Sequence, residues 1–118
     1  MADPIDAGSI ASTLFTTVKG QIEGAASGFL SSHQDVETFL LQAATRLGKA
    51  MFLHWIEKDP AKLALLAEEI VDEKDAILEE SEAILKEIED SSGSLVLQIL
   101  KTSFGVAAAM APLAIKLL

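Results

Sequence analysis

The residue types that most often carry out chemistry are sparse in this sequence. There is no cysteine, and the two histidines are His33 and His54. A carboxylate-bridged metal site in a helical bundle draws a Glu-x-x-His pair from each of two helices, but neither histidine lies three residues after a glutamate. The reversed spacing occurs once, at His54 and Glu57. We therefore interpret His54 as a core or interface histidine and expect no metal site.

The familiar catalytic arrangements are missing as well. Without cysteine there is no disulfide, thiol nucleophile or thiolate ligand, and a serine nucleophile would have only two histidines to choose from as its usual base. The sequence contains no Gly-x-Ser-x-Gly turn, no phosphate-binding glycine loop and no dinucleotide fingerprint. The acidic residues lack the spacing of an EF-hand loop. We predict that the protein is not an enzyme and has no cofactor and no small-molecule substrate.

Charge is distributed unevenly along the 118 residues. The net charge is −9, and residues 68–90 alone carry that charge, with eleven acidic residues against Lys74 and Lys86. Phosphate neutralisation needs clustered Lys and Arg, so we predict no nucleic-acid partner. Half of the residues are hydrophobic and the mean hydropathy is +0.36, a composition that excludes a disordered chain.

Apolar residues recur at helical spacing along most of the chain, which predicts an all-α fold in a single domain, residues 1–118. We expect about four helices that form a helical bundle or an assembly of helical hairpins. Their expected ranges are roughly 7–30, 35–58, 60–89 and 94–118.

Two pairs of residues mark helix starts in this sequence. In Asp59-Pro60 an N-cap aspartate precedes a proline at the first helical position, where no amide donor is needed. Ser32, followed three residues later by Asp35, predicts a side-chain cap for the second helix.

Small residues recur every four positions on one side of the first predicted helix. Glycine in a helix interior lowers stability by roughly 1 kcal/mol relative to alanine, so this pattern needs a reason. Close helix approach, as in membranes, is one interpretation; tight packing within a soluble bundle or fraying of this helix is the other. The residues are Ser12, Thr16, Gly20, Gly24, Gly28 and Ser32.

The last predicted helix is the most apolar segment. No charge lies between Lys101 and Lys116, and residues 104–115 are apolar throughout. This run is shorter than the roughly 20 residues that span a bilayer, although residues 95–118 would suffice with both lysines at the interfaces. A central helix of a bundle would be equally apolar. Pro112 is expected to kink its last turns.

Three groups of residues are therefore candidates for packing and interface contacts. The glycines would allow close helix contact, the isoleucines form the apolar seam of helix 60–89, and the last group forms a buried anchor in the final helix. They are Gly20, Gly24 and Gly28; Ile70, Ile77 and Ile84; and Phe104, Val106, Met110 and Leu113.

Three of the four predicted helices have too few charges to cover their outer sides, so an isolated monomer would expose large apolar patches. We predict a structural protein that forms a homo-oligomer or a larger assembly, such as a virion component or part of a membrane-attached complex. The alternative is a membrane-inserting or pore-forming protein that uses the first helix, the last helix or both.

Two resemblances accompany these alternatives. The mixture of Ala-rich apolar and acidic helices is similar in composition to small helical virion components of bacteriophages. Residues 2–5 and 9–11 resemble the opening of fungal HeLo-type domains, which are four-helix modules that permeabilise membranes. That resemblance covers about ten residues, and no further motif extends it, so no family is assigned. No basic region of a signal peptide precedes Lys19, and we expect cytoplasmic synthesis with membrane or particle contact.

Overall fold

The structure is a computed structural model that describes the backbone of residues 7–88 and 91–117 and the side chains in these ranges as far as Ala109. These residues form helices and no strands, which confirms the predicted all-α fold. The helices are α1 (Ala7–Ala25), α2 (Phe29–Ser32), α3 (Gln34–Ile56), α4 (Pro60–Leu85) and α5 (Ser91–Leu117).

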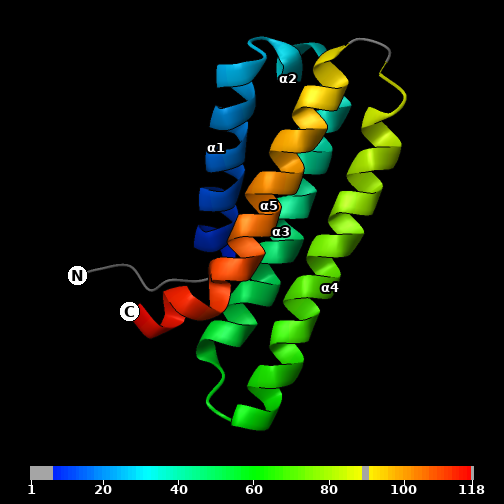
Figure 1. The fold of residues 1–118 in the computed structure, drawn as a ribbon. Coiled ribbons are helices and arrows are strands. Elements are labelled where there is room, and N and C mark those ends of the chain that lie inside the picture. Colours follow the sequence, from blue (N-terminus) through cyan, green and yellow to red (C-terminus); the bar gives the residue numbers. More distant parts are fainter. Residues whose placement is uncertain (1–6, 89–90, 118) are drawn as a thin grey trace, which may run out of the picture.

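The four long helices run alternately up and down and pack as an antiparallel bundle (Figure 1). Short connections of this kind place consecutive helices side by side. α1 packs mainly on α3, α4 packs on both α3 and α5, and α5 closes the bundle against α1. α1 and α4 therefore stand on opposite sides of the molecule (Figure 1). The last turns of α5 run at an angle to the rest of that helix (Figure 1), as expected for Pro112.

The core lies along the axis of the bundle, where the apolar stripes of the long helices meet. Burial of each large aliphatic or aromatic side chain contributes about 1.5–3 kcal/mol. Ile70 and Ile77 are fully buried as predicted for the seam of α4, and Ile84 is partly buried at its end. The largest buried side chains include Ile22, Leu40, Leu47, Ile77, Leu100 and Phe104.

The first long helix ends earlier than predicted. α1 stops at Ala25, and Gly28 has a φ of 82°, which lies in the left-handed region that residues with a side chain rarely adopt. The chain therefore turns at Gly28 and begins α2, whose Phe29 and Leu30 are buried against the end of the core. The prediction of one continuous helix over 7–30 is wrong beyond Ala25.

The start of α4 follows the sequence prediction. Oδ1 of Asp59 accepts a hydrogen bond from the backbone N–H of Ala61 at 3.0 Å, and Pro60 occupies the first position of the helix. One carboxylate oxygen of Glu57 also accepts the backbone N–H groups of Lys58 and Asp59, at 3.0 and 3.1 Å. These hydrogen bonds lower the pKa of Glu57, the one to Asp59 most. The connection between α3 and α4 is therefore held by side-chain acceptors.

The start of α3 differs from the prediction. The N-cap residue is His33, which makes no side-chain cap bond, so the predicted cap by Ser32 is wrong. Nδ1 of His33 instead lies 2.9 Å from the carbonyl oxygen of Phe29, and its ring stacks on the Phe29 ring with the centroids 4.3 Å apart. The cap lies one residue later than predicted because α2 uses Ser32 as its last residue.

A close contact between two helices lies at Gly48, on α3. A Cβ atom built there would be 2.9 Å from the backbone nitrogen of Ala11 and 3.0 Å from its Cα. Both residues are buried, so Gly48 allows the backbones of α1 and α3 to meet without an intervening side chain. Cβ atoms built at Gly20 and Gly24 would meet nothing within 4 Å.

Gly48→Ala is expected to lower the free energy of unfolding by roughly 1 kcal/mol. Displacing α1 costs about 1–3 kcal/mol, which exceeds the roughly 1 kcal/mol gained in helix propensity. Gly105→Ala is the matched control. A Cβ atom there meets none of the described atoms within 4 Å, so this variant should only gain stability through its higher helix propensity. Urea denaturation measures both variants, and equal shifts of the same sign would contradict the Gly48 contact.

Candidate interaction surfaces

The outer side of α1 carries small, uncharged residues. Gly20 and Gly24 are exposed, and the space beside each is open. Ser12 and Thr16 continue the same line toward the start of the helix and are exposed too. The predicted stripe of small residues therefore faces away from the core, and packing inside the bundle does not account for it. Gly28 does not belong to this line, because α1 ends at Ala25 and Gly28 adopts a left-handed conformation.

Beside this stripe, α5 adds exposed apolar residues. The side chains of Gln21 and Ser103 are hydrogen-bonded, which fixes the two helices next to each other. Leu95 and Val106 lie on the same outer side of α5 as Ser103, by helical spacing, and Val106 is 50% exposed. Val106 is thus not part of the buried anchor predicted for this helix. We use the name α1–α5 face for Ser12, Thr13, Thr16, Thr17, Gly20, Gly24, Leu95, Thr102 and Val106.

Charged residues are few on these two helices. Within 7–25 and 91–109 they are Lys19, Glu23 and Lys101. Nζ of Lys19 lies 3.1 Å from Oε1 of Glu37 on α3, and a carboxylate oxygen of Glu23 accepts the backbone N–H of Gly28 at 3.2 Å. Two of the three charged groups are therefore already engaged within the molecule.

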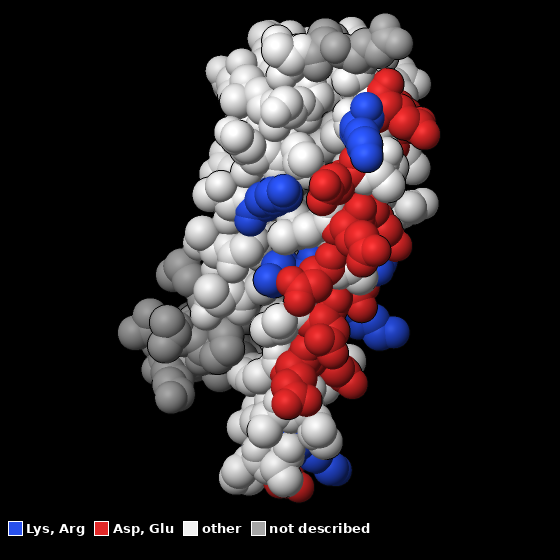
Figure 2. Space-filling view, turned by 45° about the vertical axis from the view of Figure 1, so that its right-hand side comes forward, with Lys and Arg blue, Asp and Glu red and all other residues white. Residues whose placement is uncertain are grey.

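The opposite side of the molecule is strongly acidic. Exposed carboxylates recur along α4 at intervals of four and three residues, opposite the buried Ile70 and Ile77. Figure 2 shows them as a continuous band that runs along the molecule beside uncharged surface. We use the name acidic band for Glu68, Asp72, Asp75, Glu79 and Glu82.

Arg46 links α3 to the carboxylates of α4 that point toward it. Its Nε lies 2.6 Å from Oε1 of Glu73 and its Nη1 lies 2.6 Å from Oε2 of Glu80. The hydrogen bond to Glu80 is the largest cause that raises the pKa of Arg46; burial opposes it, and the bond to Glu73 adds to it. Lys74, whose position falls on the apolar seam, reaches outward to Oδ1 of Asp75 at 2.6 Å.

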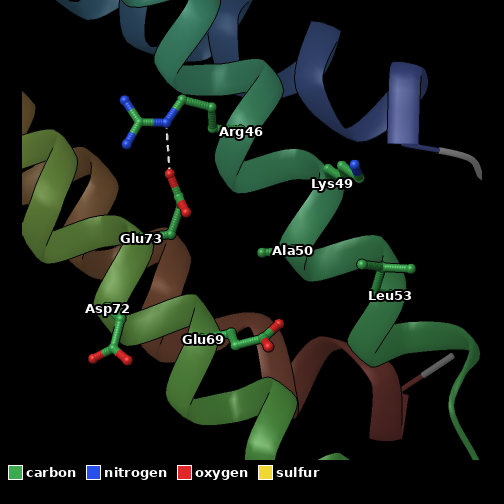
Figure 3. A pocket seen from close by; sticks show the side chains of 7 residues that line it. All are labelled: Arg46, Lys49, Ala50, Leu53, Glu69, Asp72 and Glu73. Atoms are coloured by element: carbon green, nitrogen blue, oxygen red, sulfur yellow. Dashed lines mark hydrogen bonds and ion pairs between the residues drawn. The ribbon is translucent and has the colours of Figure 1, made fainter.

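A hollow of about 260 Å³ opens between α3 and α4 below this arginine (Figure 3). Ala50 and Leu53 supply apolar surface from α3, and Glu69 points from α4 into the space between the helices (Figure 3). We use the name α3–α4 hollow for the site lined by Arg46, Lys49, Ala50, Leu53, Glu69, Asp72 and Glu73.

Among the described residues, two buried polar side chains lie outside these surfaces. His54 is buried as predicted, and its Nδ1 has no hydrogen-bond partner within that part of the chain. Ser81 is fully buried and donates its hydroxyl to the carbonyl oxygen of Ile77 at 2.7 Å. In the part of the chain that the structure describes, no group of three or more His, Asp or Glu residues is placed to hold a metal ion.

The candidate residues predicted from the sequence do not form one site. The isoleucines of α4 and Phe104 lie in the core, whereas Gly20, Gly24 and Val106 face outward. The side chains of Met110 and Leu113 lie outside the described residues. Sequence reasoning missed Arg46 and Gly48; the Ala44-to-Gly48 spacing of four on the apolar side of α3 was the signal for the second.

None of the helices over the described residues is long and apolar enough to cross a membrane. Comparison with known proteins finds no matching family model, no matching curated protein and no matching solved structure.

Arg46→Met is expected to lower the free energy of unfolding by about 1 kcal/mol at low salt. The variant keeps the aliphatic stem and removes both ion pairs. Because these pairs are partly exposed, each contributes only about 0.2–1 kcal/mol to the free energy of unfolding. About half of the loss should disappear at 1 M salt, where the Debye length is about 3 Å. The control is Lys49→Met, whose lysine makes no ion pair with the described residues. Equal losses for both variants in urea denaturation would contradict the role of Arg46.

Proposed function

We propose that this protein is a non-enzymatic assembly protein whose copies associate through the α1–α5 face. The observation that carries the proposal is the open space at Gly20 and Gly24. Each glycine lowers the stability of α1 by roughly 1 kcal/mol relative to alanine, and no contact with the residues that the structure describes requires it. Close approach of a helix from another copy supplies the missing reason.

The distribution of charge favours this face over the opposite one. Residues 68–90 carry a net charge of −9, and contact between two α4 helices would bring like charges together, which is destabilising. The α1–α5 face contains no charged residue by contrast, and Lys19 and Glu23 at its edges are bonded within their own molecule. Association through this face leaves every acidic band in water.

The dimensions of the face suit a protein–protein contact. α1 has 19 residues, which at 1.5 Å per residue make a helix about 28 Å long. Two adjacent helices of about 10 Å diameter present roughly 550 Å² in projection, or roughly 1,100 Å² over both partners, which is at the lower end of the range for specific interfaces. Leu95 and Val106 provide the exposed apolar surface that such an interface buries.

Mass by light scattering in plain buffer and again in detergent tests the proposal. We expect a defined mass in plain buffer that is a multiple of the 12.5 kDa chain, because the α1–α5 face is covered by other copies. A monomer in both conditions would contradict the proposal. Aggregation that detergent dissolves would replace it with the membrane-inserting alternative.

Gly24→Leu is expected to reduce the oligomer to monomer while its far-ultraviolet circular dichroism stays unchanged. The leucine has free space within the molecule and raises helix propensity, but it would stand between two closely packed helices of different copies. Ala64→Leu, at an exposed position of α4, is the control and should keep the native mass. Loss of the oligomer in both variants, or in neither, would contradict assembly through α1.

A further inference from the structure

We infer that the α3–α4 hollow and the exposed apolar residues at its lower end form a docking groove for a cationic amphipathic helix of a partner protein. This groove lies away from the α1–α5 face, between the two helices that Arg46 links. The inference is therefore independent of self-association.

The groove offers apolar anchoring surface. Leu53 lies near the end of α3 and is 37% exposed, and Leu65 lies near the start of α4 and is 62% exposed. Because α3 and α4 are antiparallel and joined by a short connection, these leucines belong to the same end of the helix pair (Figure 1). Leu65 is one turn before Glu69, on the side of α4 that borders the hollow. Amphipathic helices dock their apolar side chains into grooves of this kind.

The charge of the groove defines the polar side of its partner. Glu69 and Asp72 line the hollow, and neither makes an ion pair with the described residues. The guanidinium of Arg46 is already shared by Glu73 and Glu80. In Figure 3 the ammonium group of Lys49 lies on the side of α3 away from α4. A docked helix would thus meet unpaired carboxylates along one edge, which Lys or Arg side chains complement.

The same charges disfavour the other occupants. A second copy does not match, because its described helices present isolated cations and no row of them. α4 is acidic, and Lys19 of α1 is already paired with Glu37. α3 has Arg46, which is shared by two carboxylates, and Lys49, while α5 has Lys101 as its one charge over residues 91–109. Anionic lipid does not match either, because the acidic band runs beside the groove and would be repelled by a negative surface. A cationic protein helix satisfies both the apolar surface and the carboxylates.

A labelled synthetic peptide of about 18 residues tests the inference by fluorescence anisotropy at low salt. The probe contains only Leu and Lys, with Leu at helical spacing, and is long enough to form a helix. We expect the native protein to bind it, and to bind a peptide with the same residues in scrambled order at least about tenfold more weakly. A Leu/Glu peptide of the same pattern should not bind. Absence of binding by the patterned Leu/Lys peptide, or equal binding of any control peptide, would overturn the inference.

Two charge-reversed variants separate the groove from diffuse attraction to the acidic band. The double variant Glu69→Lys with Asp72→Lys should weaken binding of the Leu/Lys peptide at least about tenfold. The double variant Glu79→Lys with Glu82→Lys makes the same change in net charge on the same helix, away from the hollow. It should weaken binding of the peptide less than about threefold. Equal weakening of peptide binding by both double variants would overturn the inference that the peptide binds in the groove.

A pair of leucine variants tests the apolar contact and separates it from self-association. Leu65→Ser should weaken the peptide at least about fivefold and leave the mass of the oligomer unchanged. Leu95→Ser, on the α1–α5 face, should leave peptide binding unchanged. A fall in oligomer mass caused by Leu65→Ser would show that a second copy covers the groove, and would overturn the inference while leaving open where copies associate.

Discussion

The high free-energy cost of burying the eleven acidic residues of residues 68–90 is the constraint on which the arrangement of this bundle depends. These side chains cannot enter the core without partners, so the apolar seam of α4 must face inward and most of its carboxylates must face water. Glu73 and Glu80 lie on the side of α4 nearest α3, where Arg46 forms an ion pair with each and its single positive charge offsets one of the two negative charges. The net charge of the protein is thereby concentrated on one side, and the helix on the other side, α1, is left almost without charge.

Glycine serves two different purposes in this molecule. Gly48 is buried where α3 meets the backbone of Ala11, and its missing side chain is needed for the fold itself. Gly20 and Gly24 lie in α1 with open space beside them, so their missing side chains are not needed by the fold. In the sequence both helices show small residues four positions apart, Ala44 and Gly48 on α3 and Gly20 and Gly24 on α1. Only the structure shows that Gly48 makes a contact inside the molecule and that Gly20 and Gly24 face outward.

The pattern of the sequence predicted the parts of the fold that depend on local chemistry. Asp59 starts α4 by accepting a hydrogen bond from a backbone N–H two residues away, and Pro60 has no N–H that would need a partner. The helical spacing of Ile70 and Ile77 predicts that both are buried. The break at Gly28 was not predicted, because a left-handed glycine and a helical glycine look alike in a sequence. The α3–α4 hollow and the pairing of Arg46 with Glu73 and Glu80 depend on residues about 30 positions apart, whose register appears only when the helices are packed.

If another copy covers the outer side of α1, side chains on that side are shielded from solvent. The chain has no cysteine, so Thr16→Cys introduces a single thiol on the α1–α5 face with little change in volume, and Thr45→Cys does the same at an exposed position of α3. The direct measurement is the rate at which each thiol reacts with a soluble thiol reagent, over a range of protein concentrations. We expect the thiol at position 16 to react at least about tenfold more slowly than the one at position 45, with protection that weakens on dilution. Equal rates at every concentration would contradict the covering of α1 by another copy.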